Sequence, residues 1–444
     1  MDLRSLFIFG IIAYFSAKGF KHPHIGLMLM VWVGYMNPHR LVPWGIIYSA
    51  PVAFWAFLVT VVGYAISKEK FKLPPQKIIP VLFVFWLWCG ICTIFAFNPE
   101  SAQREYIRFT KILLATFMAL LLLQKKERIN LLVWVMSLSI AFYGIKGGLF
   151  ALATGGQFRV WGPPDSFIEG NNELALALLS AFPLLYYLRG QVENKWLKRA
   201  FLLAMVLCLI SVVSSYSRGA FLAMGVTSIF LWYKSKHKLA LAMLGFVLVL
   251  AAVPFIPEHW FNRMNTIQTY EEDASAMGRI NAWTLAFNIS KAHITSGGFN
   301  HWGPITFALY APVPDKIHDA HSIYFEVLGE QGFIGLFLFL TCLLMTWLLC
   351  NKTIKLSQVY EEHAWCGNLC KMLQVSLIAY MSGGAFLGLA YWDWPYHIMA
   401  LAILTNHYIN KELEKGPPSS SGQDVENAQE PKPTLDTTHL IKRR

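Results

Sequence analysis

Residues 322–349 read SIYFEVLGEQGFIGLFLFLTCLLMTWLL. This stretch decides the fold class, because a helix needs roughly 20 mainly apolar residues to cross the hydrocarbon core of a bilayer. Similar apolar runs recur along the chain, and no soluble fold explains them. The sequence therefore predicts an all-α, polytopic membrane protein.

The other apolar runs set the expected number of helices. The further candidate spans are Pro51–Ile66, Ile79–Phe97, Tyr106–Leu123, Asn130–Leu152, Asn172–Leu188, Ala200–Val213, Gly219–Tyr233, Leu239–Pro254, Met372–Ala390 and about Trp394–Ile409. Two shorter pieces, Leu3–Ala17 and His24–Met36, precede them and are separated by Lys18, Lys21 and Pro23. We therefore expect about 12 transmembrane helices, with room for one more.

The chain divides into four parts by composition. Residues 1–253 hold transmembrane helices with short loops, 254–321 form the one long polar loop, and 322–410 hold the C-terminal transmembrane helices. Residues 411–444 contain few aliphatic side chains and cannot bury enough apolar surface to order themselves, which predicts a disordered cytoplasmic tail without catalytic chemistry.

The formal net charge is +11, and its placement predicts the orientation in the membrane. Short cytoplasmic loops accumulate Lys and Arg. Every second loop here is basic: Lys68, Lys70, Lys72 and Lys77; Lys125, Lys126 and Arg128; Arg189, Lys195, Lys198 and Arg199; Lys234, Lys236 and Lys238. The opposite, outer face then carries Asn98–Glu105, Ala153–Asn171, Ser214–Arg218, Tyr391–Asp393 and the long loop. No nucleic-acid partner is expected.

The cysteines do not predict a disulfide framework. Five lie in apolar helices or at their ends, and the other two fall on the cytoplasmic side. Cys89 and Cys92 have the spacing of a redox or metal pair, but their apolar setting favours helix packing. The first apolar piece ends in lysines rather than in small residues, so no cleavable signal sequence is expected.

Ionisable groups in or beside membrane helices are costly and indicate functional sites. On the outer side these are Lys146, Arg159, Arg218, Arg279 and His321. Each has a simpler interpretation: Lys146 can extend to the interface, and Arg159 beside Trp161 can anchor the protein there. Several cations on one face with few acids nearby nevertheless predict a site for a dense anion such as a diphosphate.

Arg218 and Arg279 have local settings that favour anion binding. Arg218 follows four hydroxyl residues, Ser214 to Ser217, at a helix start, where free N–H groups and the helix dipole attract an anion. Apolar residues at helical spacing between Met277 and Ile289 predict a surface helix capped by Ser275, with Arg279 in its first turn. Such a helix can anchor the loop and also present Arg279.

His321 is the group in this region suited to accept a proton near neutral pH. Neighbouring arginines would disfavour the imidazolium and keep the ring a base. A histidine at a helix start is also a common cap or interface residue. His318 lies one turn earlier, but with only Asp319 as a third local ligand the pair is a weak metal signal, and we expect no metal.

At this point the residues resemble a known family. Residues 319–326 (DAHSIYFE), with the glycines that follow, resemble the histidine-led helix of the O-antigen ligase and polymerase superfamily. Residues 217–219 (SRG), 278–279 (GR) with Trp283, and 171–173 (NNE) are similar to its arginine- and asparagine-bearing segments. Residues 35–40 (YMNPHR) and 159–164 (RVWGPP) resemble the branch of O-glycosylation ligases associated with exosortase systems.

The resemblance implies a multi-pass, GT-C-like enzyme of the bacterial inner membrane, active on the periplasmic face. It would move a saccharide from undecaprenyl diphosphate to a hydroxyl of a lipid A core sugar or a protein, inverting the anomeric centre without a metal or other cofactor. Carried over, His321 would be the base, and Arg218 and Arg279 would hold the diphosphate. We add Arg159, Lys146, Asn172 and His318 as substrate-binding candidates.

Two departures and two alternatives remain. Ser322 stands where many members carry asparagine, and the helix after His321 is rich in phenylalanine, which leaves the acceptor open. A polysaccharide polymerase on the same scaffold is the first alternative. The second is a transporter of lipid-linked glycans, which would place ionisable groups near mid-bilayer and often shows inverted repeats that this sequence lacks.

Overall fold

A computed structural model describes residues 3–41, 48, 50–69, 72–234, 238 and 274–415. Within these ranges all regular structure is helical, and no β-strand occurs. The all-α prediction is confirmed to this extent. The expected span Leu239–Pro254, the first part of the long loop and nearly all of the expected tail lie outside the described residues.

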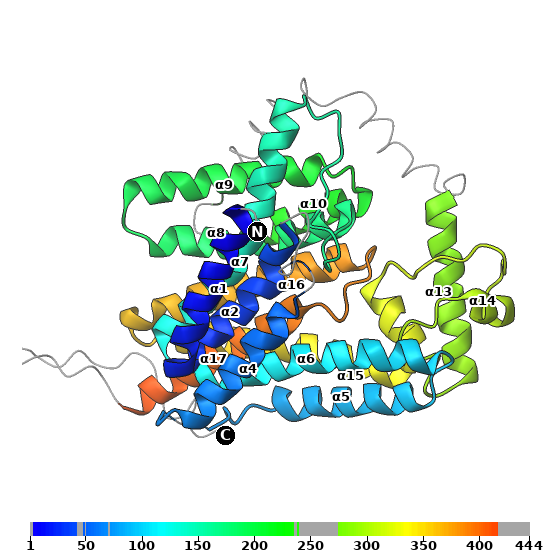
Figure 1. The fold of residues 1–444 in the computed structure, drawn as a ribbon, viewed down its shortest axis with the longest axis horizontal. Coiled ribbons are helices and arrows are strands. Elements are labelled where there is room, and N and C mark those ends of the chain that lie inside the picture. Colours follow the sequence, from blue (N-terminus) through cyan, green and yellow to red (C-terminus); the bar gives the residue numbers. More distant parts are fainter. Residues whose placement is uncertain are drawn as a thin grey trace, which may run out of the picture.

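Fourteen α-helices and two short 3-10 helices make up the described part of the chain (Figure 1). They are α1 (Leu3–Lys21), α2 (Pro23–Met36), η1 (Pro38–Leu41), α4 (Val52–Ile66), α5 (Ile78–Ile94), α6 (Pro99–Leu122), α7 (Lys126–Ala153), α8 (Asn171–Gln191), α9 (Lys195–Val213), α10 (Arg218–Lys234), α13 (Ala274–Ala292), α14 (Pro304–Tyr310), α15 (Ile323–Leu356), η4 (Glu361–His363), α16 (Ala364–Gly384) and α17 (Asp393–Glu414).

Four described helices are long and apolar enough to cross a membrane, namely α1, α7, α9 and α15. Helices α2, α4 and α5 are also apolar but shorter. Large apolar side chains such as Phe7, Trp55 and Phe337 are exposed on helices of both groups, as expected for surfaces that face lipid. The multi-pass character predicted from the sequence rests on these helices, and the total of about 12 remains a prediction.

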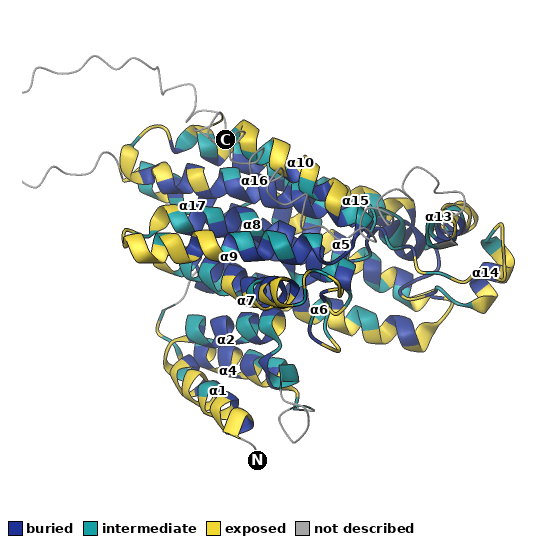
Figure 2. Cartoon of the chain, turned by 90° about the horizontal axis from the view of Figure 1, so that it is seen from above, coloured by how far each residue is buried: buried dark blue, intermediate teal, exposed yellow. Residues whose placement is uncertain are grey.

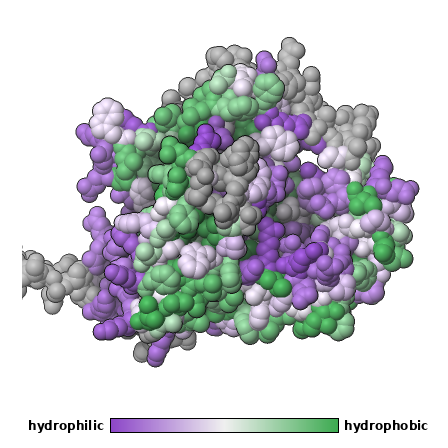
Figure 3. Space-filling view, in the orientation of Figure 1, coloured by the Kyte–Doolittle hydropathy of each residue, from purple (hydrophilic) through white to green (hydrophobic). Residues whose placement is uncertain are grey.

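The buried core lies between α8, α16 and α17, whose surfaces are mostly dark in Figure 2. Helices α1, α2 and α4 form a group at one side of it in the same view. Figure 3 shows apolar side chains across the middle of one face and polar side chains towards its two ends, one of them over α13 and α14. An apolar middle between polar ends is the arrangement that a bilayer requires.

Two predicted boundaries were wrong. Helix α6 begins at Pro99 because the Asn98 side chain accepts a hydrogen bond from Ser101 N (3.3 Å), so the expected outer loop 98–105 is mostly helix. Helix α16 ends at Gly384, although the apolar pattern continued to Ala390. Residues 385–392 instead form a turn, and this turn places Phe386 and Leu387 at the candidate site.

Helix α15 is divided at Gly332, which has φ +68°. A Cβ at this position would lie 2.6 Å from the carbonyl oxygen of Ile294, so the conformation and the close approach both require glycine. The Trp88 indole donates to the Gln331 carbonyl (2.7 Å) beside the kink. The kink gives the first segment of α15, which follows His321, a different direction from the rest of the helix.

Helix α13 runs across the ends of α5, α6 and α15 rather than alongside them (Figure 1). It runs from Ala274 to Ala292, so Ser275 lies inside the helix and the prediction that Ser275 caps its start was wrong. Its apolar residues Ala282, Leu285 and Ile289 form a small buried core with Phe307 of α14. This orientation places Arg279 over the helix ends, and the position of α13 on a membrane surface stays a prediction.

Candidate functional site

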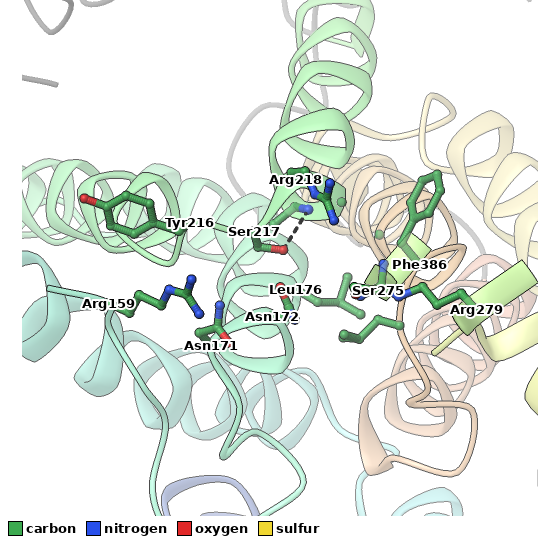
Figure 4. Close-up of a pocket in the computed structure, with 14 residues that line it drawn as sticks. Arg159, Asn171, Asn172, Leu176, Tyr216, Ser217, Arg218, Ser275, Arg279 and Phe386 are labelled. Atoms are coloured by element: carbon green, nitrogen blue, oxygen red, sulfur yellow. Dashed lines mark hydrogen bonds between the residues drawn. The ribbon is translucent and has the colours of Figure 1, made fainter. Parts of the chain in front are cut away.

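A cavity of about 600 Å³, open mouth included, lies at the ends of α8, α10, α13 and α16. The residues that line it are Arg159, Asn171, Asn172, Leu176, Tyr216, Ser217, Arg218, Gly219, Ala220, Ser275, Arg279, Gly383, Phe386 and Leu387. We call it the arginine cavity. Figure 4 shows the guanidinium groups of Arg159, Arg218 and Arg279 approaching it from three sides. Its lining contains no Asp or Glu.

The turn before α10 delivers Arg218 to this cavity. Tyr216 adopts a positive φ of 57°, which reverses the chain between α9 and α10. The Ser217 hydroxyl then accepts a hydrogen bond from Ala220 N (3.2 Å), and this caps the start of α10. Arg218 is the first residue of the helix, so its guanidinium stands beside backbone N–H groups at the positive end of the helix dipole.

The loop that carries Arg159 is fixed to the same turn. Val160 N donates to the Ser214 carbonyl (3.1 Å), and the Asn171 amide donates to the Ser215 carbonyl (2.7 Å). The Tyr216 hydroxyl also donates to the Gly156 carbonyl. These bonds hold Arg159, Arg218 and the start of α8 in one arrangement. Asn172 and Asn171 both line the cavity, and the substrate-binding role of Asn172 stays a prediction.

Arg279 reaches the cavity from α13. Gly278 lies against His318, and a Cβ on it would stand 2.8 Å from the His318 ring. This close approach brings the loop 311–322 next to the first turns of α13. Arg279 also lies within electrostatic reach of Glu173 on α8. The start of α13 with Arg279 therefore lies close to the loop 311–322 and to α8, although these three elements are far apart in the sequence.

His321 lies beside Arg279, but neither His321 nor His318 is among the residues that line the arginine cavity. Burial is the main cause that lowers the pKa of His321 to about 4, and the positive charges of Arg279 and His318 contribute to this shift. The ring is thus neutral at pH 7 and able to accept a proton. The rings of His318 and His321 meet edge to face with centroids 5.0 Å apart.

Trp283 sets the position of His321. Its indole N–H donates to the Ala320 carbonyl (2.7 Å), which belongs to the peptide bond that precedes His321. Its ring stacks on Phe325, with centroids 4.8 Å apart and planes 8° apart. His321 itself has a positive φ of 42°, a conformation that needs such support. Trp283 lies one turn after Arg279, so a single helix positions both groups.

Lys146 lies apart from this arrangement. Its side chain is exposed on α7, and it does not line the arginine cavity. Ser217, Ser275 and Phe386 were not predicted from the sequence as site residues, although all three line the arginine cavity. The hydroxyl run before Arg218 was a usable signal for Ser217, whereas nothing in the apolar segment around Phe386 indicated a site.

The seven cysteines are all described, and each is buried with a free thiol. Within the described ranges, no three His, Cys, Asp or Glu side chains gather as metal ligands would. The chemistry that the arginine cavity itself offers is binding of an anion with several oxygens, because guanidinium groups donate paired hydrogen bonds to such groups. Hydroxyl and amide groups between the arginines can add neutral donors.

Comparison with protein families gives two matches. Residues 3–192 match a family of unknown function (DUF5935), and residues 203–340 match the family described as O-Antigen ligase. No curated protein matches the chain. Arg218, Arg279 and His321 fall within the second match, and Arg159 and Asn172 fall within the first. With its apolar helices, the chain is a multi-pass membrane protein that carries an O-antigen ligase domain at residues 203–340, and this domain supports membership of the O-antigen ligase superfamily.

Proposed function

We propose that this protein transfers a saccharide from undecaprenyl diphosphate to an acceptor hydroxyl at the outer face of the inner membrane. The family supports a glycan ligase or polymerase function in general terms. The observation that carries the finer proposal is the convergence of Arg159, Arg218 and Arg279 on one cavity whose lining has no acidic side chain. A diphosphate is the group of the donor that such a lining would bind most strongly.

In the proposed reaction the acceptor oxygen attacks the anomeric carbon of the donor. The bond between this carbon and the phosphate oxygen breaks, and its electron pair leaves with the diphosphate. Arg218 and Arg279 stabilise the charge that develops on the leaving oxygens, with Arg159 as a third donor. His321 accepts the acceptor proton. Attack opposite to the leaving group inverts the anomeric centre.

The low pKa of His321 has a consequence for this mechanism. A ring with a pKa of about 4 is a weak base in the free protein. The diphosphate would bring negative charge next to Arg279 and offset the positive charge that lowers the pKa of His321. Donor binding should therefore raise this pKa, so that the base becomes stronger once the donor is present.

The placement of the cations also bears on transport. The arginines that line the cavity lie at helix starts or in a connecting loop, not in the middle of an apolar helix. This placement favours transfer at a membrane face over movement of the glycan across the bilayer. The proposal gives Lys146 and His318 no direct contact with the diphosphate, because neither residue lines the arginine cavity.

Reconstitution of the purified protein with a lipid-linked glycan tests the proposal. Lipid A core, a hydroxyl-bearing protein and a free glycan end would be offered as acceptors, and gain of mass would identify the one used. A single transfer to core or protein supports a ligase, including the exosortase-associated branch, whereas growth of the glycan supports the polymerase alternative. Release of no diphosphate with any acceptor would contradict the proposal.

A further inference from the structure

A second cavity of about 750 Å³ lies between α2, the start of α4, the middle of α6 and the start of α17, and it shares no lining residue with the arginine cavity. We call it the α6–α17 cavity. Its charged lining residues are Arg108, Lys111, Asp165 and Asp393, and the rest of its lining is mainly apolar. We propose that it binds a zwitterionic aminophospholipid, with the lipid phosphate on Arg108 and Lys111 and the ammonium group on Asp393.

The cationic side of the cavity comes from α6. Arg108 and Lys111 are three residues apart, so their side chains lie on the same face of the helix. The Arg108 guanidinium stands 3.7 Å from the centroid of the Phe167 ring, which fixes it at the cavity. Its pairing with Glu105 is long (3.7 Å) and exposed, and therefore weak. Lys111 makes no ion pair within the described part of the chain. Both cations are therefore able to bind a phosphate group.

The two carboxylates differ in what they already bind. Asp165 accepts hydrogen bonds from Arg40 (3.1 Å) and from the Tyr48 hydroxyl (2.8 Å), so its charge is largely satisfied. Asp393 is half-buried at the start of α17 and lies within electrostatic reach of Arg108. It forms no ion pair with any described residue. An arginine and an aspartate that face one cavity without pairing suit a ligand that carries both charges.

This charge pattern separates the candidate lipids. An anionic phospholipid without an amine would satisfy Arg108 and Lys111 but leave Asp393 facing the cavity without a cation, which is costly in a partly buried setting. A trimethylated headgroup carries the positive charge but has no N–H to donate to the carboxylate. A primary ammonium group both neutralises Asp393 and donates to it. The lining therefore favours an ethanolamine-type headgroup.

The apolar part of the lining suits the lipid beyond its headgroup. Met30 and Val31 from α2, with Ile112 and Ala115 from α6, form an apolar wall of the cavity beside the charged residues. His397 is buried, and its Nδ1 pairs with the Tyr35 hydroxyl at 2.7 Å. Its Nε2 has no hydrogen-bond partner among the described residues. When Tyr35 donates to Nδ1, Nε2 carries the proton and can donate to an ester carbonyl of the lipid.

Native mass spectrometry of the delipidated protein in detergent tests this proposal. Phosphatidylethanolamine, phosphatidylglycerol and phosphatidylcholine would be titrated separately. We expect one phosphatidylethanolamine to bind about tenfold more tightly than either of the others. Equal affinity for the three lipids, or a preference for phosphatidylglycerol or phosphatidylcholine, would overturn the proposal.

Three variants make the test specific. Asp393→Asn should remove the preference for phosphatidylethanolamine over phosphatidylglycerol, and Lys111→Gln should weaken binding of both. Arg104→Gln is the matched control, because Arg104 is an exposed cation on α6 that does not line the cavity. Lys111 is exposed, so its variant should fold even if Asp393→Asn does not. Unchanged lipid binding in Lys111→Gln would contradict the assignment.

The proposal does not depend on glycan transfer. Arg218→Ala should impair use of the donor and leave phosphatidylethanolamine binding unchanged, because Arg218 belongs only to the arginine cavity. A variant that loses donor use but still binds phosphatidylethanolamine, or one that loses phosphatidylethanolamine binding but still uses the donor, therefore distinguishes the two proposals.

Discussion

The arginine cavity and the α6–α17 cavity are of similar size, yet their linings differ in charge. The first gathers three arginines and no acid, whereas the second sets two cations against two carboxylates and adds apolar walls. A charge of one sign suits a dense anion, and a balanced lining suits a zwitterion. The loop 154–170 borders both, with Arg159 on one side and Phe167 on the other. The difference teaches that ligand class here follows from the signs of the charges that line each cavity.

The largest effect is expected at the base. His321→Ala should lower the rate of glycan transfer by about 10²–10⁴-fold, because it removes the group that accepts the acceptor proton. Donor binding should change little, since His321 does not line the arginine cavity. The measurement is transfer by purified, reconstituted protein, with circular dichroism to confirm folding. Transfer at the wild-type rate would remove His321 from the mechanism.

The next effect tests whether the two cavities are separate. Arg279→Ala should reduce transfer roughly 100- to 1,000-fold, through loss of one donor to the leaving diphosphate. Arg218→Lys should cost less, since lysine keeps the charge but loses the paired hydrogen bonds. Neither change should alter phosphatidylethanolamine binding. Arg104→Gln controls for loss of a cation elsewhere. Wild-type donor kinetics in both arginine variants would show that these residues do not bind the diphosphate and would favour a role as interface anchors.

A smaller effect is expected at Trp283, the residue that links the arginine helix to the base. Trp283→Phe keeps the ring that stacks on Phe325 but removes the hydrogen bond to Ala320. One such bond is worth about 0.5–1.5 kcal/mol, so kcat should fall about two- to tenfold while KM for the donor stays the same. Trp161→Phe, at an exposed position, is the matched control. An equal change in both variants would contradict the positioning role.

The smallest effect concerns pH. The pKa of His321 is lowered to about 4 in the free protein, so protonation removes the base only below that pH. The value of kcat/KM for the donor, which reports free enzyme, should therefore be flat near neutral pH and fall as pH drops through about 4. The profile of kcat, which reports the donor complex, should fall at a higher pH. Coincident profiles would argue against an effect of the donor on His321.

Much of the arginine cavity could be predicted because its cations are conspicuous in an apolar chain. Arg218 and Arg279 each sit in a local pattern, a hydroxyl run before a helix and an amphipathic repeat, and these patterns depend only on neighbours in sequence. Lys146 shows the limit of that reasoning. An apolar context identifies a costly cation, but it does not say which way the helix turns it, and the structure leaves Lys146 exposed on α7.

Other features depend on contacts between distant segments. The end of α16 could not be predicted, because residues 385–390 are as apolar as the helix before them. The support of His321 by Trp283 depends on α13 crossing the start of α15. The α6–α17 cavity depends on Arg108 and Asp393 meeting from helices far apart in sequence. Hydropathy patterns and residue spacing do not show which distant segments are in contact.

Equilibrium binding of undecaprenyl diphosphate to the reconstituted protein tests the central claim most directly, because this ligand carries the diphosphate without a glycan. We predict that the wild-type protein and His321→Ala bind it with similar affinity, and that the double variant Arg218→Ala, Arg279→Ala binds it at least about 100-fold more weakly. Wild-type affinity in the double variant would contradict the account.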